Sequence, residues 1–433
     1  MINTVSFRTL GCRLNQSESD SIQYELQNAG FTIVDKKVPS DLTIINSCAV
    51  TRQAEAKTRG AIAAARRISP NGKIVVVGCY AQLSAQDLKH LSGVNLILGN
   101  NEKYRIMDFL NGLEDGGTEI RVSDEVGGNT FSPPGIISRG THTRAHMKIQ
   151  EGCDYRCAYC VIPLLRGGTR SRNFADCIAE AKLLVEQGIK EIVLSGINIG
   201  TYMSEGGRDL TDLIESLLKE TDIQRLRISS IEPDLIPDRL IALMKHEPRI
   251  CRHFHIPLQH GSNEILGLMR RRYRVESYIE IVEKIAGSVP EVCIGTDVLV
   301  GFPGESEEHF IETAKLLERL PLAYFHVFRF SARPETAASK LRDNVKIRDK
   351  KIRSEQLRKL SETCSNHFLR RFVGKKLRVL FEKKNKSGLY EGLSDNYIKV
   401  NVKSKEPLIN QIKNVAITQI NGAVAQGEVV VCE

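Results

Sequence analysis

Apolar positions follow two different periods along the first hundred residues of the chain. Short runs of β-branched residues, of which 42–46 and 73–78 are the clearest, are typical of buried strands. Elsewhere apolar residues recur four positions apart, as Ile22 and Leu26 do, which is typical of amphipathic helices. Strands that alternate with helices indicate a parallel sheet covered by helices. We predict strands at 5–8, 42–46, 73–78 and 94–98, and helices at 17–28, 54–67, 85–91 and 104–110.

The same alternation returns between residues 141 and 330. It follows a stretch at 111–140 that is rich in Gly, Asp, Ser and Pro, a composition that predicts a linker. Six strand–helix units predict a partial or complete parallel barrel, whose functional residues gather at the carboxyl ends of the strands. The predicted strands are 145–150, 191–195, 225–230, 253–257, 294–300 and 323–328, with helices such as 174–187 and 210–219 between them.

The C-terminal part of the chain changes character. A strongly basic helix is predicted over 346–371, and short strands separated by Lys, Asn and Gly turns follow it at 377–381, 397–402, 415–417 and 428–431. Such strands predict a small antiparallel barrel of the OB-like kind. The predicted fold class is therefore α/β: an N-terminal open parallel α/β domain, a central (βα)6-type barrel and a C-terminal antiparallel β-barrel.

The composition is that of an ordinary globular protein, with 433 residues of which 41% are hydrophobic and 26% charged. No apolar run approaches the roughly 18–20 residues of a membrane span, and the first residues carry no signal-type segment. We therefore expect a cytoplasmic protein with no membrane partner. In a reducing compartment, clustered cysteines among the eleven are expected to bind metal or to take part in catalysis rather than to form disulfides.

Positive charge is concentrated near the C-terminus. Residues 340–405 hold 20 Lys and Arg against 7 Asp and Glu, a net charge of +13, whereas the whole chain has +9 and the remainder therefore has −4. A plain interpretation is a solvated charged surface. The functional interpretation, strengthened by the small β-rich module beside it, is a polyanionic partner such as RNA.

Three cysteines, Cys153, Cys157 and Cys160, lie within eight residues directly after the first predicted barrel strand. Thiolates on one tight loop can hold three irons of a [4Fe–4S] cluster and leave the fourth iron open for a small molecule. A zinc site would require four closed ligands, or three and a water, and usually brings Cys-x2-Cys pairs. The remaining interpretation, three unrelated core thiols, is disfavoured because three cysteines so close together are seldom a packing choice.

A second set, Cys12, Cys48 and Cys79, is spread along the N-terminal domain, and each member follows a predicted strand. The carboxyl ends of neighbouring parallel strands meet at one edge of a sheet, so these cysteines can converge although they are distant in sequence. Each one alone is more simply a buried structural thiol, because free cysteine is among the most buried residue types. Their shared position after strands favours a second cluster.

The first set resembles the radical S-adenosylmethionine (SAM) superfamily, in which Cys-x3-Cys-x2-Cys with an aromatic residue, here Tyr159, opens a βα barrel. The resemblance implies that SAM binds the open iron and that electron transfer cleaves it to methionine and a 5′-deoxyadenosyl radical. It also implies that Gly196 lies against the methionine amine, where a plain strand-to-loop turn is the alternative. Tyr159 is placed near the adenine of SAM, or else packs over the cluster.

The two sets together resemble the radical-SAM methylthiotransferases, as do the strings RGGTRSR at 166–172 and HIPLQHGS at 255–262. The resemblance implies that Cys12, Cys48 and Cys79 hold an auxiliary [4Fe–4S] cluster. Its implied partners are tRNA, a reducing electron-donor protein and a sulfur donor. It also implies four segments: an N-terminal methylthiotransferase domain at 1–115, a linker at 116–138, a radical-SAM core at 139–370 and a TRAM domain at 371–433.

The strings GCRLNQ at 11–16, NSCAVT at 46–51 and SSIEP at 229–233 resemble the branch of that family that modifies N6-threonylcarbamoyladenosine next to the tRNA anticodon. This implies transfer of a methylthio group to C2 of that base. Two alternatives keep the chemistry and change the target, to isopentenyl-adenosine in tRNA or to an aspartate of a ribosomal protein. A fourth hypothesis, a non-catalytic RNA-binding metalloprotein, leaves the cysteine triplet after the first barrel strand unexplained. The basic C-terminal part favours an RNA target.

Asp297 and Glu232 end or follow predicted barrel strands and could contact a ligand or the substrate. His253, His255 and His260 lie on or near one strand, where core or surface positions are the simpler interpretation than metal ligation.

Overall fold

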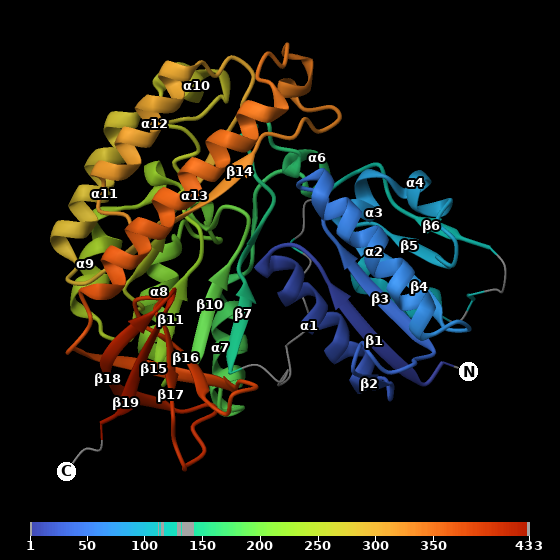
Figure 1. Ribbon diagram of the computed structural model, residues 1–433. Coiled ribbons are helices and arrows are strands. Elements are labelled where there is room, and N and C mark those ends of the chain that lie inside the picture. The colour runs from blue at the N-terminus through green and yellow to red at the C-terminus, as the bar shows by residue number, and fades with distance from the viewer. Residues whose placement is uncertain (1, 111, 114–116, 128–130, 132–142, 431–433) are drawn as a thin grey trace.

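The computed structural model describes residues 2–110, 112–113, 117–127, 131 and 143–430, which form three parts (Figure 1). An α/β sheet domain (blue in Figure 1) lies beside a larger α/β part (green to orange). A small β-barrel (red) lies at one end of the larger part. Of the predicted linker at 116–138, residues 116, 128–130 and 132–138 lie outside the described residues. None of the helices in the described segments has both the length and the apolar composition needed to cross a membrane.

The N-terminal domain is a six-stranded, fully parallel sheet with the strand order β2-β1-β3-β4-β5-β6. This confirms the predicted open parallel α/β domain. Its strands are β1 (Thr4–Thr9), β2 (Thr32–Val34), β3 (Leu42–Ser47), β4 (Lys73–Gly78), β5 (Leu96–Leu98) and β6 (Glu119–Arg121). Its helices are α1 (Arg13–Asn28), α2 (Arg52–Ile68), α3 (Cys79–Leu83), α4 (Ala85–Lys89), η1 (Lys103–Arg105) and α5 (Met107–Leu110).

Two short strands and the start of helix α1 differ from the sequence prediction. The hydrophobic pattern predicts neither β2 nor β6, because three residues are too few to show alternation, and β6 falls inside the predicted linker. Helix α1 starts at Arg13, four residues before the predicted start, and its N-cap residue is Cys12. The predicted face of α1 is correct: Ile22 and Leu26 are fully buried in the core on this side of the sheet.

The central part contains six parallel strands in two three-stranded sheets, β11-β10-β7 and β12-β13-β14. An isolated bridge between Ser230 and His255 links the two sheets, so the strands run in series from β7 to β14, as a partial barrel requires. The strands are β7 (Arg144–Lys148), β10 (Glu191–Ser195), β11 (Arg225–Ile228), β12 (His253–His255), β13 (Cys293–Val300) and β14 (Tyr324–Arg329), and β8 (Gln150–Glu151) pairs with β9 (Arg170–Ser171) beside them.

Helices cover the outside of these strands (Figure 1). They are α6 (Ile162–Arg166), α7 (Phe174–Glu186), η2 (Ile199–Thr201), α8 (Leu210–Glu220), η3 (Pro233–Leu235), α9 (Asp238–His246), α10 (Asn263–Leu268), α11 (Val275–Ser288), α12 (Glu307–Arg319) and η4 (Ala337–Lys340). The long basic helix α13 (Ile347–Arg370) packs beside β14, as Figure 1 shows, and leads into the C-terminal barrel.

The C-terminal barrel is closed in the order β15-β16-β17-β19-β18. Its strands are β15 (Lys376–Lys384), β16 (Tyr390–Ser394), β17 (Lys399–Val402), β18 (Ile412–Asn421) and β19 (Val424–Val429). The predicted antiparallel pairing is wrong at one position, because β17 and β19 pair in parallel where the barrel closes. Strand β16 is missing from the prediction because polar and glycine residues interrupt its alternation.

Two buried arginines attach this barrel to the amino-terminal end of the central sheet. Arg227 on β11 donates to the carbonyls of Ser394 and Asp395 at 3.0 Å, and Arg225 donates to that of Leu393 at 2.9 Å. Glu191 on β10 pairs with Arg227 at 2.7 Å and with Arg225 at 2.9 Å. One carboxylate therefore balances the two cations that hold the barrel in place.

We expect acid to weaken this junction. Burial by itself would raise the pKa of Glu191, but Arg225 and Arg227 outweigh it and hold the pKa at about 2. Because the folded pKa is depressed, the stabilisation is complete above the ordinary value of 4.5 and is lost as the pH falls towards 2. Glu191→Gln should therefore be less stable than wild type at pH 7, by a margin that shrinks in acid, in urea titrations at several pH values. A margin independent of pH would contradict this account.

Candidate active site

Three cysteines gather at the carboxyl edge of the N-terminal sheet. Cys12 follows β1, Cys48 follows β3 and Cys79 follows β4, and these strands are neighbours in the sheet. The backbone at Gly11 has a φ of +100°, and a Cβ there would come within 2.7 Å of the Cβ of Cys48. Only glycine accommodates both the left-handed backbone and this close approach. The glycine thus lets the loop of Cys12 lie directly on Cys48.

Polar side chains bind the first and third of these cysteines. The Sγ of Cys12 lies 3.5 Å from Oδ1 of Asn15, and Arg166 donates to the same oxygen at 3.1 Å. Arg166 also donates from Nε to the Sγ of Cys79 at 3.3 Å. Burial raises the pKa of Cys12 and that of Cys48, the latter to about 11, and negative charge on Cys79 raises both further. Arg166 and the backbone amides of Asn15 and Val50 oppose these shifts at Cys12 and Cys48.

The second set, Cys153, Cys157 and Cys160, lies on the loop between β8 and α6. The amide of Cys160 donates to the carbonyl of Cys157 at 3.0 Å, which folds the loop back on itself. Arg271 donates from Nη1 to the Sγ of Cys157 at 3.1 Å and forms an ion pair with Glu232. Burial raises the pKa of Cys160 to about 12, and also that of Cys157, although Arg271 opposes the shift at Cys157.

The spacing of the thiols fits clusters better than single ions. Four ligands of one tetrahedral zinc ion, each about 2.3 Å from the metal, would lie roughly 3.8 Å apart. Among the described residues, the only group of three or more metal-ligating side chains whose atoms all lie within 4.8 Å of one another is His255, Asp297 and His326. Neither cysteine set meets that limit. In each set at least one pair of sulfur atoms therefore lies more than 4.8 Å apart, wider than the ligand spacing around a single zinc ion.

Gly152 immediately precedes the second set, and we expect its replacement to disrupt the loop. It has a φ of +72°, and a Cβ there would lie 1.8 Å from the carbonyl oxygen of Gly168. Strain of this kind costs on the order of 1–3 kcal/mol and displaces the backbone next to Cys153. Gly152→Ala should therefore lose roughly half of the bound iron after anaerobic reconstitution, as measured by iron analysis.

A control for that variant is available at Gly168, on the loop between α6 and β9 that faces Gly152. A Cβ at Gly168 would meet only the flexible side chain of Asp154, at 2.9 Å, so Gly168→Ala should retain its iron. Equal iron loss in both variants would show that the loop tolerates no change, rather than that Gly152 is specifically required.

Five buried charged residues join the N-terminal domain to the cysteine loop, and we call them the interdomain charge network: Glu18, Lys103, Lys148, Glu151 and Arg166. Glu18 accepts from Arg166 at 2.6 Å and from Lys103 at 2.7 Å, and it lies 3.5 Å from Lys148. Glu151 pairs with Lys148 at 2.6 Å and with Arg166 at 2.7 Å. Arg166 thereby links Cys79 of one set to Glu151, two residues before Cys153 of the other.

The network sets the charge states of its own members. Burial would raise the pKa of Glu151, but Lys148 and Arg166 outweigh it and hold the pKa at about 2. Burial lowers the pKa of Lys103 to about 8, and Glu18 opposes the shift. No sequence pattern predicts this network, since its members are spread from residue 18 to residue 166. The only available signal was Arg166, which begins the string at 166–172.

The two predicted SAM contacts, Gly196 and Tyr159, lie in different surroundings. Gly196 follows β10, and a Cβ there would meet Oε1 of Gln150 and Cγ2 of Ile199, both at 2.8 Å, so close packing requires the glycine. Tyr159 packs edge-to-face on Phe302, with its hydroxyl 3.5 Å from Nη1 of Arg271. Asn198, absent from the predicted site, is only 3% exposed, and neither polar atom of its amide has a hydrogen-bond partner. Such an orphaned amide fits a polar ligand.

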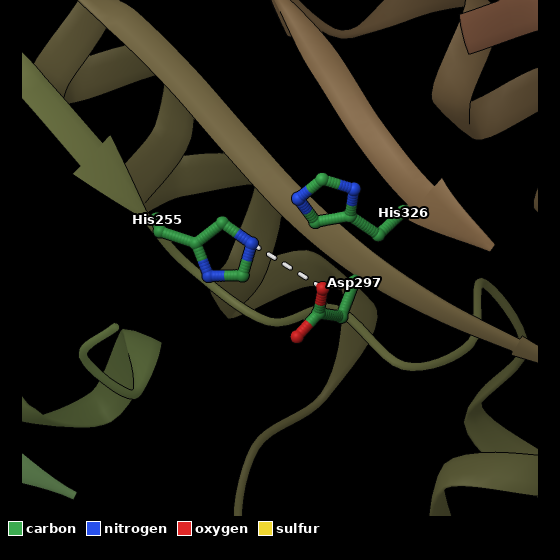
Figure 2. A group of neighbouring side chains, drawn as sticks. All are labelled: His255, Asp297 and His326. Carbon is green, nitrogen blue, oxygen red and sulfur yellow. Dashed lines mark ion pairs between the residues drawn. The ribbon is translucent and has the colours of Figure 1, made fainter. Parts of the chain in front are cut away.

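Three further polar side chains point toward one another from neighbouring strands (Figure 2). They are His255 on β12, Asp297 on β13 and His326 on β14. Nε2 of His255 lies 3.3 Å from Oδ1 of Asp297. The structure thus brings Asp297 and His255 together, and it adds His326, which the sequence analysis does not single out.

Comparison with known families covers most of the chain. The Radical SAM superfamily matches residues 147–317, the uncharacterized protein family UPF0004 matches residues 4–99, and the TRAM domain matches residues 370–430. Among solved structures, a radical S-adenosylmethionine methyltransferase, TsrM of Kitasatospora setae, has a similar fold, with a TM-score of 0.55 and 15% identity over 78% of this chain and 74% of that one.

Several named relatives match over nearly their whole length. The chain is 34% identical to threonylcarbamoyladenosine tRNA methylthiotransferase MtaB of Bacillus subtilis, over 99% of this chain and 96% of the relative. It is 37% identical to the protein of the same name in Aquifex aeolicus, over 92% and 96%. It is also 32% identical to tRNA-2-methylthio-N(6)-dimethylallyladenosine synthase of Acetivibrio thermocellus, over 98% and 90%.

Proposed function

Since this chain belongs to the radical-SAM methylthiotransferase family, we propose that it adds a methylthio group to C2 of N6-threonylcarbamoyladenosine next to the tRNA anticodon. The observation that carries the proposal is the contact of Arg166 with both cysteine sites, directly at Cys79 and through Glu151 at the loop of Cys153. An enzyme that activates a carbon and then delivers sulfur to it must hold two centres at one substrate. The match to two proteins named threonylcarbamoyladenosine tRNA methylthiotransferase supports this substrate.

We assign the metal ligands residue by residue. Cys153, Cys157 and Cys160 hold the [4Fe–4S] cluster that binds SAM, and Cys12, Cys48 and Cys79 hold the auxiliary [4Fe–4S] cluster. When bound, these groups supply the electron that cleaves SAM and the sulfur that is transferred. In each set at least one pair of sulfur atoms lies more than 4.8 Å apart, which supports cluster ligation over single-ion ligation.

The chain's own side chains orient and enclose these centres. Arg271 donates to the Sγ of Cys157 and pairs with Glu232. These two contacts hold the sulfur of Cys157 in place in the first site. Hydrogen bonds to cluster sulfurs tune a cluster's reduction potential. Arg166, which donates to Cys79, tunes the potential of the second cluster in this proposal. Tyr159 and Phe302 supply an apolar wall that keeps water from a reactive radical. Gly196, Tyr159 and the orphaned amide of Asn198 contact SAM in this proposal.

The basic C-terminal part binds the tRNA in this proposal. Residues 340–405 carry a net charge of +13. Lysines such as Lys351 on α13 and Lys383 on β15 keep more than two thirds of their side-chain surface exposed. Neutralising backbone phosphates is the main source of affinity for nucleic acids. A reducing electron-donor protein and a sulfur donor complete the partners.

We also propose that the chain divides at the boundaries 1–115, 116–138, 139–370 and 371–433. The segments matched by UPF0004, the Radical SAM superfamily and TRAM support this division, although strand β6 pairs with β5 from inside the linker.

Nucleoside mass spectrometry of tRNA from a deletion strain tests the proposed substrate. We expect the 2-methylthio form of N6-threonylcarbamoyladenosine to disappear and the unmodified base to accumulate, and the wild-type gene to restore the product. An unchanged tRNA profile would overturn the proposal. If the 2-methylthio form of N6-dimethylallyladenosine disappears instead, that base is the substrate, as the name of the Acetivibrio relative indicates for that protein.

A further inference from the structure

We propose that Arg13, His255, Asp297 and His326 form a subsite that binds the threonylcarbamoyl group of the substrate, with Arg13 and His326 on its carboxylate. We call these four residues the polar subsite. The inference rests on the proposed function and deepens it, because it names the residues that distinguish this substrate from one with an apolar N6 group.

The polar subsite lies where three parts of the molecule meet. His255, Asp297 and His326 come from adjacent strands, in a register that places Asp297 opposite His326. Arg13 comes from the N-terminal domain and directly follows Cys12 in sequence. C2 and the N6-bearing carbon belong to the same ring of adenine. A residue beside the auxiliary cysteines is therefore within reach of the N6 substituent when C2 faces those cysteines.

The C-terminal barrel holds Arg13 in position. Nη2 of Arg13 donates to the hydroxyl of Tyr397 at 2.5 Å, and the ring of Tyr397 stacks on His253 with a centroid distance of 4.2 Å. This bond uses one of the five N–H donors of the guanidinium. Tyr397 is therefore a positioning residue that fixes where the cation lies.

The charges of the polar subsite suit a group with both donors and acceptors. The ring of Tyr397, which holds Arg13, has its centroid 5.9 Å from that of Tyr324, and the ring centroid of Tyr324 lies 5.3 Å from that of His326. Burial lowers the pKa of His326, Asp297 raises it, and His255 and Arg13 lower it further. The threonylcarbamoyl group carries a carboxylate, a hydroxyl and urea N–H groups. Arg13 and a neutral His326 can donate to the carboxylate, and Asp297 can accept from the hydroxyl or an N–H. A dimethylallyl group offers none of these partners, so it would leave the polar side chains unsatisfied.

A divalent metal ion is the competing occupant, because two histidines and a carboxylate within 4.8 Å are a common metal-binding set. His255 even has the second-shell contact that such ligands use, since its Nδ1 lies 3.2 Å from the hydroxyl of Ser230. The fixed positive charge of Arg13 opposes a dication and favours an anion. We therefore assign the carboxylate, and the metal becomes an outcome of the test.

The test uses the reconstituted holoenzyme and anticodon stem-loops with N6-threonylcarbamoyladenosine as the free acid or the methyl ester. We expect wild type to have a KM about 10-fold or more higher for the ester, because charge-assisted hydrogen bonds to the carboxylate are lost. Arg13→Gln should raise the KM for the acid by a similar factor and remove the difference between the two substrates. Binding of both stem-loops without turnover, measured by fluorescence anisotropy, should show the same pattern.

Three further variants make the result specific. Tyr397→Phe should raise the KM for the acid less than Arg13→Gln does. If Arg13→Gln loses iron, His326→Gln replaces it as the test, and it should likewise raise the KM for the acid. Arg105→Gln is the matched control, because this exposed arginine pairs with Asp108 in the same domain.

Equal KM values for acid and ester in wild type would overturn the inference and leave the proposed function intact. The inference would also be overturned if wild type bound a metal ion in addition to the cluster iron and His326→Gln lost that additional ion. Wild type that modifies neither stem-loop would instead contradict the proposed function itself.

Discussion

Cys48→Ala should abolish methylthio transfer while SAM is still cleaved. The substitution removes one of three thiols at the edge of the N-terminal sheet and leaves the loop of Cys153, Cys157 and Cys160 untouched. With two four-iron clusters, the wild-type chain is expected to bind about eight irons, and the variant about four. Iron analysis, 5′-deoxyadenosine release and nucleoside mass spectrometry measure the three properties separately.

Two variants bracket that experiment. Cys157→Ala should lose both SAM cleavage and product, because it removes a ligand of the first site. Cys364→Ala should retain eight irons and full activity, since this half-buried cysteine on α13 belongs to neither set. Zinc in place of iron, with no SAM cleavage by wild type, would support a non-catalytic metalloprotein instead. Product formation by Cys48→Ala would contradict the assignment of the auxiliary cluster.

Glu18→Gln should destabilise the protein by roughly 3–5 kcal/mol, because removing one partner of a buried ionic group leaves its counter-charges uncompensated. Glu18 is fully buried and contacts Arg166 at 2.6 Å, Lys103 at 2.7 Å and Lys148 at 3.5 Å. Burial would raise the pKa of Glu18, but these three cations hold it well below its ordinary value. Urea unfolding of the metal-free protein, followed by circular dichroism, measures the effect.

The control is an exposed ion pair of the same chemistry. Glu215 pairs with Arg239 on the surface, and both side chains keep more than 40% of their area exposed. Surface pairs contribute about 0–1 kcal/mol, so Glu215→Gln should change the unfolding midpoint little. Equal shifts in the two variants would show that the interdomain charge network has no special role in stability.

Glu18→Gln also tests the link between the two cysteine sites. Arg166 contacts Glu18, Glu151 and the Sγ of Cys79 at once. With Glu18 neutral, Arg166 is expected to shift toward Glu151 and weaken its contact with Cys79. We therefore expect a change in the spectroscopic signature of the auxiliary cluster in the variant, even under conditions where it stays folded.

The sequence predicted the fold and both cysteine sets because each leaves a local or strand-linked signal. Cys153, Cys157 and Cys160 are close in sequence, so their spacing alone predicts a shared site. Cys12, Cys48 and Cys79 are distant, but each follows a β-branched run, and parallel strands place such positions at one edge. Short strands such as β2, β6 and β16 escaped prediction because too few residues alternate within them.

Other features depended on tertiary structure alone. No sequence signal pairs Glu18 with Arg166 or Arg13 with Tyr397, since ionic and hydrogen-bonded partners far apart in the chain are defined only by how the domains pack. A single histidine such as His326 likewise carries no pattern, and it gains meaning only because β13 and β14 align it with Asp297. The sequence by itself determined the two cysteine sets and the strand ends that carry them. Domain packing decided which charges contact those sets and which polar groups lie beside one another, because electrostatic contacts depend on distance in space and not on spacing along the chain.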